Sequence, residues 1–159
     1  MGNIFAGSEI VELGIQIEKN GLDFYDTLFK QSKNESAAKI FRYLAGEEEK
    51  HIKVFQGILD KTEKYEPQGL DSEDYFAYMS ALAGEYIFTQ KDKGKEIAKK
   101  IRSDKEAVDM GIRFEKDSII FYEGIKRIVP EYDFKMVEGL IVQEQKHLRQ
   151  LSDLKQNLI

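Results

Sequence analysis

Residues 48–51 read EEKH and residues 144–147 read EQKH, so both histidines of this 159-residue chain stand three positions after a glutamate. On a helix, positions i and i+3 lie on one face about a turn apart. A carboxylate and an imidazole at that spacing can therefore bind one metal ion together. The two copies of Glu-x-x-His predict two metal ions.

A second pair of matching segments shows that the chain contains an internal repeat. Residues 15–19 (IQIEK) and 24–25 (FY) recur as residues 112–116 (IRFEK) and 121–122 (FY), an offset of 97 positions. The two Glu-x-x-His motifs are offset by 96. Two independent landmarks with nearly the same offset indicate two related helical hairpins.

Each hairpin offers the same set of polar side chains. The first contains a lone glutamate, Glu18, and a tyrosine seven residues later, Tyr25. The second contains Glu115 and Tyr122 at the same spacing. Each hairpin then supplies one Glu-x-x-His motif from its second helix.

Composition excludes several classes of protein. The net charge of −5 and the pI near 5.2 provide no basic face for a phosphate backbone, so nucleic-acid binding is not expected. The chain has no cysteine, which removes disulfides, thiolate zinc sites and iron–sulfur clusters. Any metal must be held by oxygen and nitrogen ligands. No apolar run is long enough to cross a membrane and the N-terminus lacks a secretory pattern, so we expect a cytoplasmic protein without a membrane partner.

Long stretches with a 3.6-residue period and only two prolines predict an all-α protein. We expect one domain made of a hairpin over residues 8–61, a crossover over 62–102 and a second hairpin over 103–159. The expected helices run from Ser8 to Lys30, Ser36 to Lys61, Ser103 to Pro130 and Asp133 to Leu158. Ser103 and Glu106 form a capping box at the third. An aromatic helix beginning at Asp71 or Ser72 is expected within the crossover. For both hairpins to face one centre, the crossover must run back along a four-helix bundle.

The expected inner faces of the helices place the acidic residues in the core. Their apolar members are Gly14, Ile17, Gly21, Phe24 and Leu28; Ile40, Phe41, Leu44, Phe55, Ile58 and Leu59; Val108, Ile112, Ile119 and Ile125; and Val137, Leu140, Ile141, Leu148, Leu151 and Leu154. Glu48 with His51, and Glu144 with His147, fill gaps in these series. Four buried carboxylates need compensation because each loses several kcal/mol of hydration. Two divalent ions would neutralise them. The alternative is a metal-free core of protonated acids that hydrogen-bond to the two tyrosines.

This order of residues resembles the ferritin-like di-iron carboxylate proteins, and the hairpins are most similar to rubrerythrins. The resemblance implies a ferritin-like four-helix bundle over nearly the whole chain and two iron ions, although the ligand types also suit manganese or zinc. It implies that Tyr25 and Tyr122 bond to ligand carboxylates from outside the metal shell. The implied ligands are Glu18 and Glu115 as terminal carboxylates, Glu48 and Glu144 as bridging carboxylates, and His51 and His147 as one nitrogen ligand per ion.

The sequence departs from the rubrerythrin pattern at two points. Ser118 stands where rubrerythrins usually carry a further glutamate, so the six-ligand set resembles that of bacterioferritin. The cysteine-rich rubredoxin domain is absent, which implies a separate electron-donor protein. Glu85, in the crossover, is a candidate auxiliary carboxylate, with a surface or capping role as the alternative.

The leading functional hypothesis is an oxidoreductase that reduces hydrogen peroxide or dioxygen at a di-iron centre, in the manner of rubrerythrin-like protection against oxidative stress. Three alternatives remain open. They are oxygenation of an organic substrate, ferroxidase or iron-handling activity, and a bundle that binds metal without turnover. We also expect a homodimer that associates through exposed aromatic residues of the crossover.

Overall fold

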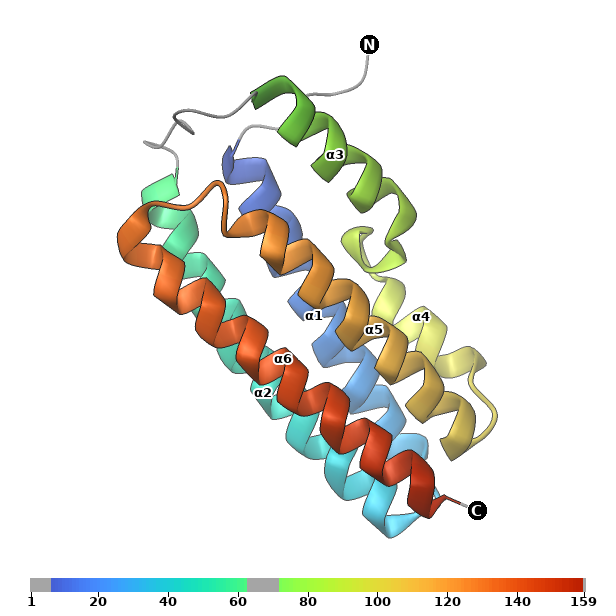
Figure 1. Cartoon of the computed structure of the whole chain (residues 1–159). Helices are drawn as coiled ribbons and strands as arrows, with labels where there is room; N and C mark the ends of the chain where they lie inside the picture. The colour runs from blue at the N-terminus through green and yellow to red at the C-terminus, as the bar shows by residue number, and fades with distance from the viewer. Residues whose placement is uncertain (1–6, 63–71, 159) are drawn as a thin grey trace.

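The computed structural model describes residues 7–62 and 72–158, and these residues form helices joined by short turns. The elements are α1 (Gly7–Gln31), α2 (Glu35–Thr62), α3 (Ser72–Glu85), the 3₁₀ helix η1 (Ile87–Thr89), α4 (Lys93–Lys100), α5 (Asp104–Ile125) and α6 (Glu131–Asn157). The four long helices α1, α2, α5 and α6 lie side by side as a bundle, while α3, η1 and α4 run along its flank (Figure 1). The predicted all-α four-helix bundle with a long crossover is confirmed.

The crossover begins outside the described part of the chain. Residues 63–71 are not described, and they include Asp71, one of the two predicted starts of the aromatic helix. The described helix begins at Ser72. Its aromatic residues pack against the bundle, since Tyr75 and Phe76 are buried and the Tyr75 hydroxyl donates to the Gly124 carbonyl of α5 at 2.6 Å. Tyr78 is half exposed.

Side-chain caps fix the ends of the helices at the lower end of the bundle in Figure 1. The Asn34 Oδ1 accepts from the Ala37 N–H at 3.0 Å, so α2 is capped by Asn34. Asp104, at the start of α5, accepts from the Ser32 hydroxyl at 2.7 Å. It also accepts from the Asn34 N–H at 3.2 Å. The turn between α1 and α2 is thereby fastened to the start of the second hairpin.

The predicted cap of α5 is present, but its predicted end is wrong. The Ser103 hydroxyl accepts from the Glu106 N–H at 3.1 Å. The helix ends at Ile125 rather than at Pro130, because the chain tightens there into i to i+3 hydrogen bonds, including one from Ile128 N–H to the Ile125 carbonyl at 3.0 Å. This turn buries Ile128, and Pro130 becomes the N-cap of α6.

The buried face of α5 is also shifted from the prediction. Ile112 and Ile119 are only partly buried, whereas Phe114 and Phe121 are fully enclosed. The reason is that α5 is covered from two directions, by the other bundle helices and by the crossover. The ring of Phe88 in η1 lies 4.8 Å from that of Phe114.

One buried amide fastens the crossover to α1. The Nδ2 of Asn20 donates to the carbonyls of Phe88 at 2.7 Å and Gln90 at 2.6 Å. Its Oδ1 accepts from the N–H groups of Lys93 and Gly94, each at 3.0 Å. A side chain at Gly94 would bring a Cβ to 1.9 Å from the Asn20 carbonyl oxygen, so this close approach requires glycine. Asn20 lies two residues after Glu18, so the two side chains leave α1 on different sides.

Candidate metal centre

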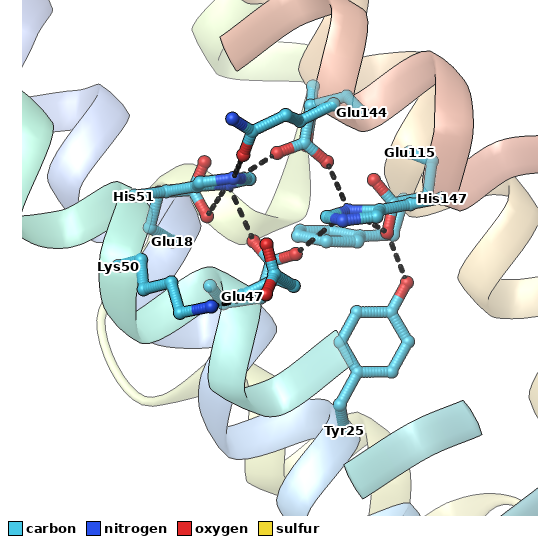
Figure 2. Close-up of polar contacts among 12 residues, drawn as sticks. Glu18, Tyr25, Glu47, Lys50, His51, Glu115, Glu144 and His147 are labelled. Carbon is cyan, nitrogen blue, oxygen red and sulfur yellow. Dashed lines mark hydrogen bonds and ion pairs between the residues drawn. The ribbon is translucent and has the colours of Figure 1, made fainter. Parts of the chain in front are cut away.

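The structure brings the six predicted metal ligands together in the middle of the bundle. Each of the four bundle helices contributes at least one: Glu18 from α1, Glu48 and His51 from α2, Glu115 from α5, and Glu144 and His147 from α6. None of the six side chains is more than 1% exposed. The five of these side chains that Figure 2 labels point toward a common centre. The Glu and His of each Glu-x-x-His motif both face inward, because positions three apart on a helix share one face.

Ligand atoms form two overlapping groups, each able to hold one metal ion. The first group is Glu18, Glu48, His51 and Glu144, and the second is Glu48, Glu115, Glu144 and His147; one ligand atom from every member lies within 4.8 Å of the others. Glu48 and Glu144 belong to both groups, which is the arrangement that two bridging carboxylates require. The two imidazole rings stack with centroids 5.6 Å apart.

Distances within the groups show which histidine nitrogen faces the carboxylates. The Nδ1 of His51 lies 2.7 Å from Glu144 Oε1 and 3.5 Å from Glu18 Oε2. The Nδ1 of His147 lies 3.4 Å from Glu144 Oε2 and 3.6 Å from Glu48 Oε1. Both rings therefore offer Nδ1 to the centre.

The chemistry of the donor atoms fits a pair of divalent cations. Most of the buried polar atoms without a hydrogen-bond partner in the described chain belong to this cluster: Glu18 Oε2, both oxygens of Glu48, His51 Nδ1, Glu115 Oε2, both oxygens of Glu144 and His147 Nδ1. Buried polar atoms are normally paired, so such a concentration calls for a partner. Carboxylate oxygens and imidazole nitrogens are ligands for iron, manganese and zinc alike.

The two predicted tyrosines contact the cluster, and each crosses to the other hairpin. The Tyr25 hydroxyl donates to Glu115 Oε1 at 2.6 Å. The Tyr122 hydroxyl donates to Glu18 Oε1. Both tyrosines are fully buried, and Figure 2 shows Tyr25 directed at Glu115 from below the cluster. Each lone glutamate is thus oriented by the tyrosine that belongs to the opposite repeat.

A family model described as Rubrerythrin matches residues 9–155. The chain belongs to the rubrerythrin family. Among solved structures, it is similar to a crystal structure at 2.30 Å resolution of a protein from Thermotoga maritima that was proposed to be a ferritin-like diiron-carboxylate protein. The two chains share 28% identity over 98% of each chain, with a TM-score of 0.68. Among curated proteins, none matches the chain significantly.

Membership of the rubrerythrin family implies a two-metal site, in agreement with the two groups of ligand atoms. The predicted resemblance to ferritin-like di-iron proteins near rubrerythrin is confirmed. No helix within the described residues is both long enough and apolar enough to span a membrane.

Burial and mutual repulsion shift the pKa values of this rubrerythrin-family cluster. Burial raises the pKa of Glu48 well above its ordinary value, and the neighbouring charges of Glu144 and Glu18 raise it further. Burial raises the pKa of Glu115 in the same way, with Glu144 as the strongest neighbour. Burial also raises the pKa of Glu144, but contacts with Glu115 and the two imidazoles outweigh it and hold that pKa below its usual range.

The pKa of His51 follows the opposite balance. Burial by itself lowers the pKa of this imidazole, but the negative charges of Glu18 and Glu144 beside it raise the value to about 11. Without metal, His51 therefore keeps its second proton at neutral pH, and Glu48 and Glu115 hold protons more strongly than ordinary carboxyl groups do. Metal ions that bind here must displace those protons.

Two contacts around the cluster were not predicted from the sequence. The Gln143 side chain hydrogen-bonds to the outer nitrogen of His51 at 2.7 Å. The Tyr86 hydroxyl, from the crossover, lies 2.9 Å from the Ser118 hydroxyl and donates to the Phe114 carbonyl at 3.1 Å. The repeat gives no sign of the first contact, because Glu47, at the position that corresponds to Gln143, bonds to Lys50 on its own helix.

Glu85 does not lie among the candidate ligands. Its side chain is exposed at the end of α3, which fits the surface role and not the auxiliary carboxylate. The next residue, Tyr86, points inward instead and occupies the space beside Ser118. Between residues 72 and 102, the part that the structure describes, the crossover therefore contributes a phenol and no further carboxylate to the surroundings of the centre.

Proposed function

We propose that this chain is a di-iron oxidoreductase that reduces hydrogen peroxide or dioxygen with electrons from an external donor protein, as part of protection against oxidative stress. One observation carries the proposal: four buried carboxylates and two buried imidazoles form two ligand groups that share Glu48 and Glu144. Buried carboxylates that served only the fold would be spread through the core or paired with lysine or arginine side chains. These six residues converge on a single centre and leave most of their donor atoms unpartnered.

In this proposal Glu18 and Glu115 are terminal ligands, Glu48 and Glu144 bridge the ions, and His51 and His147 each supply one nitrogen. The ligand types fit iron, manganese or zinc, and the choice of iron rests on the family and on the similar Thermotoga maritima protein. The four carboxylates neutralise the charge of two divalent ions, which removes the cost of burying them unpaired.

When bound, the iron pair would supply the two electrons that cleave an oxygen–oxygen bond, and the donor would return them. The chain's own residues prepare that chemistry. Tyr25 and Tyr122 fix the terminal carboxylates through their hydroxyl groups. Both tyrosines are packed among fully buried rings: Phe24 and Phe41 contact Tyr25, and Phe55 contacts Tyr122. A dry site strengthens the binding of the cations by the carboxylates.

The test is anaerobic loading with Fe(II) followed by mixing with hydrogen peroxide. We expect about two iron ions per chain and rapid peroxide consumption in the wild type, and loss of both in the His51→Ala/His147→Ala double variant. The Lys50→Ala/Lys146→Ala variant is the matched control, because each lysine immediately precedes a histidine and is exposed. Iron uptake without peroxide or dioxygen consumption would contradict the proposed activity.

The same samples separate the proposal from its alternatives. Iron storage requires a hollow shell of many subunits, whereas we propose a homodimer, so the native mass distinguishes them. A bundle that binds zinc or manganese without turnover would retain metal and leave peroxide untouched. Oxygenation of an organic substrate needs an apolar cavity beside the ligands. Three of the cavities among the described residues contain none of the six ligands in their linings.

A further inference from the structure

The two histidines of the cluster have different partners on their outer sides. The Nε2 of His51 lies 2.7 Å from the Oε1 of Gln143, a residue of α6. The imidazole of His51 is only 1% exposed, whereas Gln143 lies on the surface of the bundle. Gln143 therefore covers part of the outer side of this candidate ligand.

This contact determines which nitrogen of His51 keeps its proton. The amide oxygen can only accept, so the ring must donate its Nε2–H. The Nδ1 faces the carboxylates of Glu144 and Glu18, at 2.7 and 3.5 Å from their nearer oxygens. Once a metal ion displaces the Nδ1 proton, the tautomer that remains is the one that Gln143 selects. Such outer hydrogen bonds orient ligating histidines and increase their basicity.

The internal repeat shows that the second histidine lacks this support. Glu47 occupies the repeat position that corresponds to Gln143, but its carboxylate bonds to Lys50 on its own helix at 2.7 Å. Among the described residues, none hydrogen-bonds to the outer nitrogen of His147. Its ring is instead contacted edge-on by Tyr43, with centroids 6.2 Å apart. Tyr43 is 39% exposed.

We propose that Gln143 is a positioning residue for one half of the metal centre: it accepts the Nε2 proton of His51 and holds Nδ1 ready for the ion of the group that contains Glu18. This inference rests on the proposed function only to the extent that the cluster binds metal. It makes the two half-sites unequal, since His51 is oriented before metal arrives and His147 is not.

The experiment compares three single variants with the wild type by titration with Co(II), which reports each ion through its visible absorption. Gln143→Leu keeps the size and helix preference of the side chain but removes the acceptor. Gln143→Glu restores an acceptor. Gln145→Leu is the matched control, because Gln145 is an exposed amide on the same helix. We expect Gln143→Leu to weaken one of the two ions about 10- to 100-fold and Gln143→Glu to recover it, while Gln145→Leu matches the wild type.

A second measurement separates positioning from a general effect on folding. In the zinc-loaded protein, the Nε2–H of His51 should exchange slowly with solvent in nitrogen-15 NMR spectra of the wild type and of Gln143→Glu. In Gln143→Leu that exchange should become fast, with an unchanged melting temperature. Equal weakening of both ions, or an unchanged Nε2–H signal, would overturn the role of Gln143. If the wild type binds two ions and Gln143→Leu binds them equally well, only this inference fails; if the wild type binds none, the proposed centre fails as well.

Discussion

The two hairpins are alike where they face each other and different where they face outward. On the inner side, α1–α2 and α5–α6 each present a lone glutamate, a tyrosine and a Glu-x-x-His motif, and the six candidate ligands are equally buried. On the outer side, Asn20 and its repeat counterpart Asp117 have separate environments. Asn20 is 1% exposed and binds the crossover, whereas Asp117 is exposed. The shared centre requires paired ligands, and the single crossover covers only one outer face in this way.

The largest effect is expected from removing a carboxylate that both ligand groups share. Glu144→Gln keeps the shape of the side chain but removes one negative charge from each group. The two ions then face too little negative charge, so we expect metal content to fall from about two ions per chain to well below one. Elemental analysis after loading and gel filtration measures this content.

The unshared glutamates provide the matched comparison. Glu18→Gln and Glu115→Gln each alter one group only, so each should lose about one ion and keep the other. Glu138→Gln, an exposed position on α6, controls for the loss of charge. If Glu144→Gln retained one ion, the interpretation of Glu144 as a shared ligand would be wrong.

Metal affinity should fall steeply as the pH is lowered. His51 has a pKa of about 11 in the metal-free cluster, and burial raises the pKa values of Glu48 and Glu115 above their ordinary values. Metal binding releases the Nδ1 proton of His51, so lower pH favours the metal-free form. At least one proton is released per chain, and the apparent affinity should fall about tenfold or more per pH unit from pH 8 to pH 6.

Calorimetry in buffers of different protonation enthalpy counts the released protons directly. The His51→Ala variant should release about one proton fewer than the wild type. The stability of the metal-free fold depends on pH in the opposite direction to metal affinity. Because folding raises the pKa of His51, its contribution to the free energy of unfolding is complete below pH 6.5 and is lost as the pH rises toward 11. An affinity that did not change with pH would contradict the assignment of these protons.

A smaller effect, on stability alone, should distinguish the two outer faces. Asn20→Ala removes four hydrogen bonds to the crossover and leaves buried main-chain groups unpaired, so we expect a loss of roughly 3–5 kcal/mol in the free energy of unfolding. Asp117→Ala, at the repeat-equivalent exposed position, should change it by less than about 0.5 kcal/mol. Urea unfolding of the metal-free protein measures both. Equal losses would mean that the crossover attachment does not stabilise the fold.

The sequence was sufficient to predict the six candidate ligands because helical periodicity alone turns Glu18, Glu48, Glu115 and Glu144 inward. The predicted ends of the four long helices also lie within two residues of the observed ones, except at the C-terminal end of α5. Local caps such as Ser103 were also predictable, since the capping residue lies beside the helix it stabilises.

The parts that could not be predicted depend on contacts between distant segments. Asn20 bonds to groups 68 to 74 residues away, and no local pattern marks a buried amide that binds main-chain atoms. The early end of α5 follows from the burial of Ile128 under the bundle. The contact between Gln143 and His51 depends on how α2 and α6 face each other, which neither helix specifies alone.

The smallest expected effect tests whether the tyrosines cross between hairpins. Tyr25 lies seven residues after Glu18 but donates to Glu115, and Tyr122 donates to Glu18. Tyr25→Phe should therefore weaken the ion of the group that contains Glu115, and Tyr122→Phe the ion of the group that contains Glu18, each by about tenfold. Each should also cost about 1–2 kcal/mol in the stability of the metal-free protein, because a buried carboxylate oxygen loses its donor.

A double-mutant cycle decides the pairing: Tyr25→Phe should couple to Glu115→Gln and be additive with Glu18→Gln. Coupling of Tyr25 to Glu18 instead would show that each hairpin orients its own glutamate, and the crossed arrangement would be wrong.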